Sequence, residues 1–313
     1  MLALLFPGQG SQEVGMGQDV FESSPAAREI FASADRALGF EISRYCFEGP
    51  EDDLRRTEIQ QPALLTTSIA LLSALGEAGP VEPAFVAGHS LGEYTALVAS
   101  GAMAFEDAVR LVNARGRYMQ EAVAEGTGAM AAILGAGAEE IANVCTDISD
   151  RTGQVVSPAN YNSPQQTVIA GEADAVAMAC ERALEAGAKK TVPLPVSAPF
   201  HCALMAPAAA KLRRDIDTVS FQPPSPPVVT NVEAVPNADP ARIPDLLEAQ
   251  VTAPVRFTEM IECLKGQGVS HYLEVGAGRV LSGLLARIER RSKRESLSAA
   301  EDLENVRNFI AEE

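Results

Sequence analysis

The chain has 313 residues, of which 47% are hydrophobic and 21% charged, so it is long enough for a sizeable core and unlike disordered or fibrous proteins. Its formal net charge of −17 argues against nucleic acid or an anionic membrane as the main partner, because either would require a basic face. No apolar run approaches the length of a membrane span. The five scattered cysteines lack the spacing of a metal site or a disulfide framework. This cysteine pattern favours a reducing cytoplasm and no bound metal.

The chain opens with an apolar run at residues 2–6 that predicts a first strand. Pro7 ends this run, which lacks the basic residues and the cleavage site of a signal peptide. The glycine-rich turn that follows, "PGQGSQEVG", does not complete the G-x-G-x-x-G spacing of dinucleotide sites, and neither does "EVGAGRVLSG" near the C-terminus. We therefore expect no nicotinamide or flavin cofactor.

A second short strand, predicted at residues 84–88, leads directly into the sequence "GHSLG" at 88–92. The two glycines of this pattern are expected to allow a sharp turn from strand to helix that exposes Ser90 as a nucleophile, with the first N–H groups of the helix aimed at an oxyanion. G-x-S-x-G arises by chance in many proteins. The preceding strand and the helical pattern of residues 91–103 are the context that a nucleophile turn requires, so they make the motif more specific here.

The next helical pattern, residues 105–123, places Arg115 on its apolar stripe, whereas Arg110 and Arg117 share the opposite face. A buried arginine is costly unless an anion meets it, and its planar fork matches a carboxylate. One interpretation is an internal ion pair with a glutamate, and the other is a substrate carboxylate. The second becomes attractive if Arg115 lies beside Ser90.

Residues 127–197 follow a different order and predict a small inserted domain. Short apolar runs and helical patterns alternate there as β-α-β-β-α-β, the ferredoxin-like arrangement. A cleft between this domain and the rest of the chain is the expected place for a ligand.

A serine nucleophile needs a base, and the chain has three histidines. His89 adjoins Ser90 on a tight turn, where neighbours point apart, and His271 lies in a strand pattern typical of a core histidine. His201 follows a proline-broken loop at the end of the inserted domain and can face the cleft. No Asp or Glu follows a strand of the large domain between Ser90 and His201, so an acid-oriented hydrolase triad fits poorly.

Two further strands are predicted at residues 226–231 and 270–276. Strands that alternate with helices predict an α/β fold: a large domain with a parallel sheet and an α/β-hydrolase-like core, plus the inserted ferredoxin-like α+β domain. The predicted boundaries are 1–126 and 198–313 for the large domain and 127–197 for the small one. The basic run Arg287–Arg294 reads as a solvated helix end, and the acidic residues from about 295 as a loosely held helix or tail.

Taken together, these pieces resemble the acyltransferase family of fatty acid and polyketide synthesis, and especially its malonyl-CoA:acyl carrier protein transacylases. Seven motifs in the same order carry the resemblance over nearly the whole chain, which makes it far more specific than any single motif. They are "FPGQGSQ" at 6–12, "QQPAL" at 60–64, "GHSLGEY" at 88–94, "RGRYMQ" at 115–120, "YNSPQQTVIAG" at 161–171, "APFHCALM" at 198–205 and "APVRF" at 253–257.

The resemblance implies a role for each matching residue. Ser90 would be the acylated nucleophile, His201 its general base and then acid, and the backbone carbonyl of Gln250 the group that holds the histidine. The remaining implied roles are an oxyanion hole from the backbone amides of Gln9 and Leu91, a carboxylate clamp at Arg115, a pocket lining at Gln61, and contacts to pantetheine or acyl chain at Asn160 and Asn162.

Phe200 matches the malonyl-selecting form of the family, since a bulky ring there leaves little room for a branch at the α-carbon. Two residues depart from the usual pattern: Cys202 stands where the family usually has serine, and Ala277 stands in a turn that more commonly holds proline. Neither departure touches the chemistry, although Cys202 could change the polarity of the pocket.

The implied reaction is a ping-pong transfer of malonyl from malonyl-CoA to acyl carrier protein, in fatty acid synthesis, by a monomer without metal or redox cofactor. Because carrier protein is acidic, a local basic patch is expected, and Lys189 with Lys190 is the candidate. Three other hypotheses stay open: a trans-acting acyltransferase of a polyketide or polyunsaturated lipid pathway, a serine esterase or thioesterase, and a carrier-binding module without activity.

Overall fold

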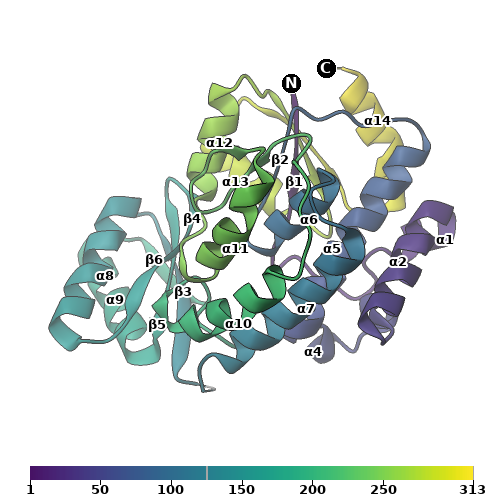
Figure 1. Cartoon of the computed structure of the whole chain (residues 1–313). Coiled ribbons are helices and arrows are strands. Elements are labelled where there is room, and N and C mark those ends of the chain that lie inside the picture. Colours follow the sequence, from purple (N-terminus) through teal and green to yellow (C-terminus); the bar gives the residue numbers. More distant parts are fainter. Residues whose placement is uncertain (125, 313) are drawn as a thin grey trace.

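Two sheets organise the computed structural model, which describes residues 1–124 and 126–312 (Figure 1). The large subdomain has a six-stranded sheet in the order β10-β9-β1-β2-β7-β8, parallel except where β8 meets β7. Its central strand, β1, is buried at every position between β9 and β2, as expected of a parallel sheet covered on both faces. The strands are β1 (Leu2–Phe6), β2 (Phe85–Gly88), β7 (Val228–Val229), β8 (Pro236–Asn237), β9 (His271–Val275) and β10 (Lys293–Leu297).

The small subdomain lies to one side, with two helices outermost (Figure 1). Its sheet has the order β4-β5-β3-β6 with every pairing antiparallel. The sequence of elements confirms the predicted β-α-β-β-α-β arrangement, while the exact domain boundaries stay predictions. The elements are β3 (Gly128–Leu134), α8 (Ala138–Thr152), β4 (Val156–Ser163), β5 (Gln166–Glu172), α9 (Ala173–Glu185) and β6 (Lys190–Pro193).

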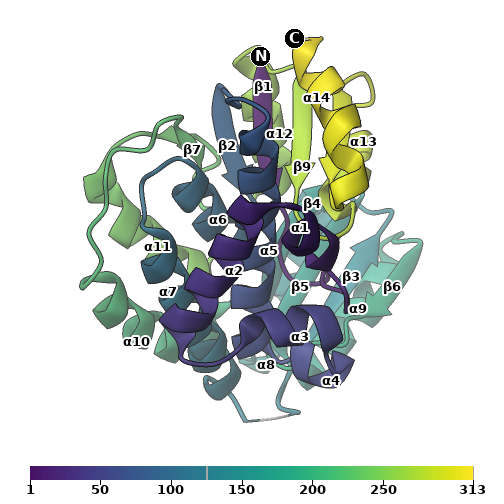
Figure 2. The same cartoon turned by 90° about the vertical axis from the view of Figure 1, so that its right-hand side faces the viewer.

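Helices cover both faces of the large sheet (Figure 2). They are α1 (Gln18–Ser23), α2 (Pro25–Leu38), α3 (Ile42–Glu48), α4 (Glu51–Leu54), α5 (Thr57–Glu77), α6 (Leu91–Ala99), α7 (Phe105–Glu121), α10 (Ala206–Ile216), α11 (Ile243–Thr252), α12 (Phe257–Gly266), α13 (Val280–Ile288) and α14 (Leu303–Ala311), with 3₁₀ turns at Ala203–Met205, Pro240–Arg242 and Ala300–Asp302. None of the described helices combines the length and the apolar character that crossing a membrane requires.

The C-terminal prediction was wrong in one respect. Helix α13 ends at Ile288, and residues 293–297 of the expected helix end and tail form the edge strand β10, parallel to β9. Its inner residue Leu297 is fully buried, while Lys293 is exposed at the edge, and charged residues on an edge strand protect it from pairing with other chains. The following helix α14 packs through the buried Val306. Residue 313 lies outside the described residues.

Candidate active site

The serine turn joins β2 to α6, which begins at Leu91. Ser90 itself adopts the strained conformation, with φ 53° and ψ −108°. Neither glycine of the pattern is among the glycines with positive φ, so the turn does not depend on a left-handed glycine. The two glycines are required for close approach: a Cβ on Gly88 would lie 2.0 Å from the backbone of Gly92, and one on Gly92 would lie 2.1 Å from the carbonyl oxygen of Phe6.

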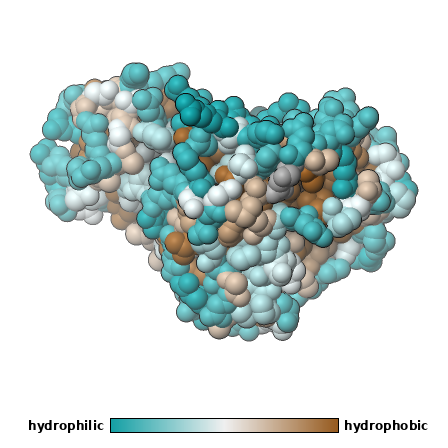
Figure 3. Space-filling model, turned by 90° about the horizontal axis from the view of Figure 1, so that it is seen from above, coloured by the Kyte–Doolittle hydropathy of each residue, from teal (hydrophilic) through white to brown (hydrophobic). Residues whose placement is uncertain are grey.

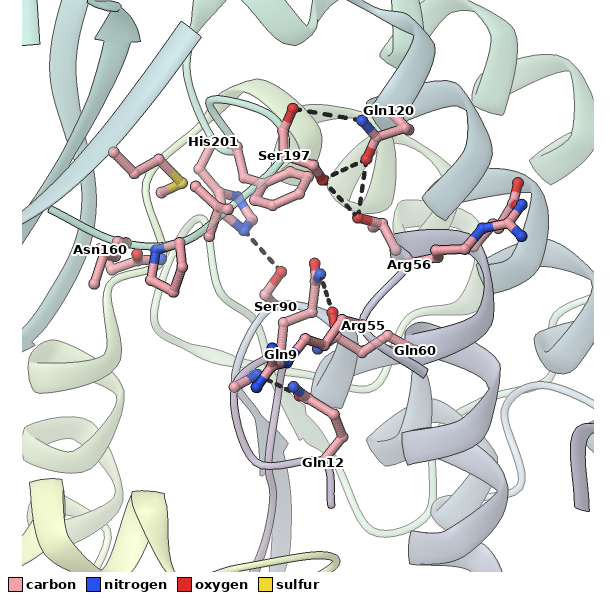
Figure 4. A pocket seen from close by; sticks show the side chains of 18 of the residues that line it. Gln9, Gln12, Arg55, Arg56, Gln60, Ser90, Gln120, Asn160, Ser197 and His201 are labelled. Atoms are coloured by element: carbon pink, nitrogen blue, oxygen red, sulfur yellow. Dashed lines mark hydrogen bonds and ion pairs between the residues drawn. The ribbon is translucent and has the colours of Figure 1, made fainter. Parts of the chain in front are cut away.

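A pocket of about 1050 Å³ opens above this turn, between the two subdomains (Figure 4). Ser90 and His201 both line it. The large subdomain also contributes Gln9, and the small subdomain contributes Asn160 and Met130. Residues 194–197, which follow β6, complete the wall. The predicted cleft between the domains therefore contains the predicted nucleophile and base.

A directed chain of hydrogen bonds runs through the serine. Ser90 Oγ lies 2.7 Å from His201 Nε2 and accepts from Arg115 Nη2 at 3.1 Å. Because arginine only donates, the serine hydroxyl proton is directed at Nε2, and the histidine proton therefore sits on Nδ1. Nδ1–H donates to the backbone carbonyl of Gln250 at 2.9 Å and of Ala253 at 3.2 Å. A carbonyl thus takes the place of the missing aspartate.

His201 is electrostatically prepared to be a neutral base. Burial, and next the nearby positive charge of Arg115, lower the pKa of His201 to about 3. Its imidazole is therefore unprotonated throughout the physiological range and ready to accept the serine proton. Like Ser90, it has a positive φ, 60°, so both members of the pair are held in uncommon backbone conformations.

Arg115 is the most unusual charge in the molecule, because its side chain is completely buried. Nη1 donates to Gln61 Oε1 at 2.9 Å, Nη2 donates to Gln250 Oε1 at 3.0 Å as well as to Ser90, and the guanidinium carbon lies 5.3 Å from the centre of the Tyr94 ring. Nε has no hydrogen-bond partner within the described chain.

The internal ion pair that the sequence left open is not found: the salt bridges of the described residues include none to Arg115. Arg115 lies behind the serine and is not among the residues that line the pocket. Glu93 interacts with Arg115 electrostatically and is joined to it through the side chain of Gln250, without touching it. A buried cation that no carboxylate contacts directly is costly, and a bound carboxylate would reduce that cost.

The two amides expected to bind an oxyanion have their N–H groups available. Among the described residues no hydrogen bond is donated by the backbone N–H of Gln9 or of Leu91. The side chain of Gln9 is fixed from both sides, since it donates to Gln60 and accepts from Gln61 Nε2 at 3.3 Å. Figure 4 shows Gln9 and Gln60 below Ser90 and His201.

The other predicted residues divide into two groups. Phe200 and Asn160 line the pocket, whereas Gln61 is fully buried beneath it and bonded to Arg115. Asn162 is not part of the lining. Its Oδ1 lies 2.8 Å from His89 Nε2, so the histidine beside the serine has a hydrogen-bonding role.

Cys202 does not change the polarity of the pocket in the way that the sequence allowed. Its thiol donates to the carbonyl of Pro199 at 3.1 Å and is not among the lining residues. Burial raises the pKa of Cys202 to about 11, so the thiol stays protonated at neutral pH. Within the described chain, no group of three or more His, Cys, Asp and Glu side chains is arranged to hold a metal ion.

Sequence reasoning missed two buried residues, Glu93 and Asn231. Glu93 Oε2 accepts from Gln250 Nε2 at 2.7 Å and from the backbone N–H of Asn231 at 3.2 Å. The side chain of Asn231 accepts from the backbone N–H of Ser90 at 2.7 Å and donates to the carbonyl of Gly88 at 2.7 Å. Their only signals in the sequence are position: Glu93 lies inside "GHSLGEY", and Asn231 ends the predicted strand at 226–231.

We expect Glu93 to make stability fall as pH rises. Burial is the main cause that raises the pKa of Glu93 from 4.5 to about 7. Between these values the folded chain binds a proton that the unfolded chain has lost, so rising pH disfavours the folded state, by up to about 3 kcal/mol at pH 8. In Glu93→Gln the side chain cannot titrate, so this dependence of the free energy of unfolding on pH should be lost. Urea unfolding at pH 5 and pH 8 measures the free energy of unfolding, and Glu181→Gln, at an exposed glutamate, is the control. If the free energy of unfolding changes with pH in Glu93→Gln as it does in the wild type, the prediction is contradicted.

The sequence matches the family model described as "Acyl transferase domain" over residues 3–295. Among curated proteins, it is 50% identical over 286 residues to the malonyl CoA-acyl carrier protein transacylase of Escherichia coli strain K12, covering 91% of this chain and 92% of that protein. It is 47% identical over 312 residues to the protein of the same name in Bacillus subtilis, covering 100% of this chain and 98% of that one.

The solved structures that the fold resembles carry the same kind of name as these relatives. An acyl carrier protein S-malonyltransferase from Vibrio cholerae superposes with a TM-score of 0.95 at 46% identity, covering 97% of this chain and 99% of that one. A malonyl-transacylase solved in complex with a type II PKS acyl-carrier protein superposes with a TM-score of 0.94 at 44% identity, covering 97% and 98%. Fold and sequence therefore point to the same group of proteins.

Proposed function

The chain belongs to the acyl transferase domain family, and we propose that it transfers the malonyl group of malonyl-CoA to the phosphopantetheine thiol of acyl carrier protein, through an ester on Ser90, in fatty acid biosynthesis. The observation that carries the proposal is Arg115, whose buried guanidinium contacts no carboxylate of the described residues directly and lies 3.1 Å from the nucleophilic oxygen. A malonyl group holds a free carboxylate one methylene away from its reacting carbonyl, so the group that binds this carboxylate has to lie close to the nucleophile. A simple ester hydrolase has no need of the arginine.

In the acylation step, Ser90 Oγ attacks the thioester carbonyl of malonyl-CoA while His201 Nε2 takes the hydroxyl proton. The negative charge that develops on the carbonyl oxygen is stabilised by the amides of Gln9 and Leu91. When the intermediate collapses, the bond to sulfur breaks and His201 returns its proton to the leaving CoA thiolate. The malonyl ester on Ser90 remains, with its carboxylate on Arg115.

The second half-reaction repeats these steps in reverse. The phosphopantetheine thiol of acyl carrier protein gives its proton to His201 and attacks the ester carbonyl, and Ser90 is released with the proton returned to its oxygen. Phe200 favours malonyl over methylmalonyl, because one methyl group in an apolar pocket is worth about 1 to 3 kcal/mol. The expected result is a preference and not an exclusion.

Intact-protein mass measurement tests the proposal directly. Mixing the protein with malonyl-CoA should give an adduct of one malonyl group, and adding holo acyl carrier protein should remove it and produce malonyl carrier protein. An esterase or thioesterase predicts instead that the adduct disappears in water as fast as in carrier protein. A carrier-binding module without activity predicts no adduct at all.

The carrier protein is proposed to approach over β6. Lys189 and Lys190 are exposed there, and Lys190 lies four residues before the pocket-lining Leu194, roughly 13 Å along an extended strand. The face of the molecule that Figure 3 shows is mostly hydrophilic, with small scattered hydrophobic areas, in line with the large net charge of the chain.

Replacing Lys189 and Lys190 with Glu should raise the KM for carrier protein by about tenfold, because an acidic partner meets reversed charge, and should leave acylation by malonyl-CoA unchanged. The matched control reverses Arg28 and Arg36, which are exposed on α2, far from the small subdomain (Figure 1). Steady-state kinetics with varied carrier protein measure the effect. An unchanged KM would place the docking surface elsewhere.

The remaining proposals concern the cellular setting. We propose that the protein works as a cytoplasmic monomer and needs no metal or redox cofactor, since the transfer uses only the serine, the histidine and the substrate thiols. A trans-acting enzyme of polyketide synthesis would use the same site. Relative rates with the two kinds of carrier protein separate these settings.

A further inference from the structure

We infer that Glu93 is a positioning residue for the transfer, because its carboxyl group bonds to both residues whose side chains hold the peptide groups of Ser90. The inference rests on the proposed function. Glu93 is 2% exposed, lies on the first turn of α6 and is not among the residues that line the pocket, so it acts only through its neighbours.

The backbone of Ser90 needs support from outside. A non-glycine residue with φ 53° and ψ −108° stays in that conformation only when its surroundings enforce it. Two side chains do so here. Asn231 Oδ1 accepts the N–H of Ser90 at 2.7 Å, and Gln250 Nε2 donates to the carbonyl of Ser90 at 3.0 Å.

Both of these supports converge on one oxygen atom. Glu93 Oε2 accepts from Gln250 Nε2 at 2.7 Å and from the backbone N–H of Asn231 at 3.2 Å. Asn231 and Gln250 come from the loop after β7 and from α11, which are distant in sequence from the serine turn. The carboxyl group therefore fixes two separate segments relative to the helix that carries the nucleophile.

Glu93 also determines which way the amide of Gln250 faces. A carboxylate accepts hydrogen bonds, so Nε2 turns toward Glu93 and Oε1 toward Arg115 Nη2, 3.0 Å away. The opposite orientation would place the amide hydrogens of Gln250 against the donors of Arg115. The backbone carbonyl of Gln250 also accepts from His201, so the carboxyl-binding group and the base depend on the same residue.

Two variants separate position from charge. Glu93→Gln keeps the length of the side chain and an oxygen for both donors, and should acylate within about fivefold of the wild-type rate. Glu93→Asp keeps a carboxyl group but moves its oxygens away from Gln250 and Asn231. It should slow acylation by roughly 10- to 100-fold, since misplacement of reacting groups by about 1 Å costs that much. Thr95→Ala, equally buried on the same helix, is the control and should change little.

The measurement is the rate constant for malonylation of Ser90 at saturating malonyl-CoA, normalised to the fraction of sites that take up malonyl. This normalisation removes any effect of partial unfolding. In Glu93→Asp the loss should be larger for malonyl than for acetyl, because Arg115 loses its alignment. Wild-type rates in Glu93→Asp, or an equal fall in both Glu93 variants, would overturn the inference. No adduct in the wild type would instead refute the proposed function.

A double-mutant cycle gives an independent check. Asn231→Ala removes the second support, so combining it with Glu93→Asp should cost less than the product of the two single losses. Losses that multiply would show that the two side chains act separately, and would contradict the inference.

Discussion

Ser90→Ala should abolish the malonyl adduct and lower transfer to carrier protein by at least about 10⁴-fold, because the hydroxyl of Ser90 has a histidine base. The hydroxyls of Thr57 and Ser197, which also line the pocket, bond to Gln120 and to each other. The serine hydroxyl donates to His201 Nε2 at 2.7 Å and accepts from Arg115 Nη2 at 3.1 Å. Intact mass after incubation with malonyl-CoA reports the adduct, and discontinuous assay of malonyl carrier protein reports the transfer.

The matched control is Ser100→Ala. Ser100 follows the other end of α6, and its buried hydroxyl donates only to the carbonyl of Leu97, so this variant removes a hydroxyl from the same helix without entering the pocket. It should form the adduct at the normal rate. An adduct that persists in Ser90→Ala would mean that another residue is acylated, and the mechanism would have to be rebuilt around that residue.

Arg115→Ala should lower kcat/KM for malonyl-CoA by roughly 10²- to 10³-fold, which corresponds to about 3 to 4 kcal/mol for a buried carboxylate that loses its charged partner. Acetyl transfer should survive or improve, because acetyl has no carboxylate and the pocket gains space. Arg115→Lys keeps the charge but not the two-pronged geometry, and should recover only part of the malonyl activity.

Arg110→Ala provides the comparison for this variant. Arg110 lies on the same helix but is exposed and paired with Asp107 at 2.7 Å, so its removal should change neither rate. The decisive quantity is the ratio of malonyl to acetyl kcat/KM in each variant. Equal losses for both acyl groups in Arg115→Ala would mean that the arginine is structural and that the malonyl carboxylate is bound elsewhere.

The sequence predicted the fold where hydrophobic pattern and chain order agree. The β-α-β-β-α-β order of the small subdomain and the first strand, Leu2–Phe6, follow directly from alternating apolar runs. Helix α5 could not be found in this way, because it is buried on nearly every side and therefore shows no apolar stripe. The edge strand β10 was missed because its charged residues resemble a solvated helix end.

The candidate site was predictable to the extent that its residues lie in short motifs. Ser90, His201 and Arg115 could be selected from residue type, scarcity and position on a helix, and the structure brings all three together. Glu93 and Asn231 could not, because their roles depend on contacts between segments more than 130 residues apart. Such contacts leave no local pattern in a single sequence.

The division of the pocket between the two subdomains separates chemistry from access. The residues proposed to move protons and charge, Ser90, His201, Gln250 and Arg115, all lie outside the small subdomain, which contributes only wall residues such as Met130 and Asn160. Substitutions in that wall can change which thioester arm enters without altering the proton path. Substitutions around Arg115 can change which acyl group is held without altering the entrance. The arm that enters and the acyl group that is held can thus be respecified independently on one scaffold.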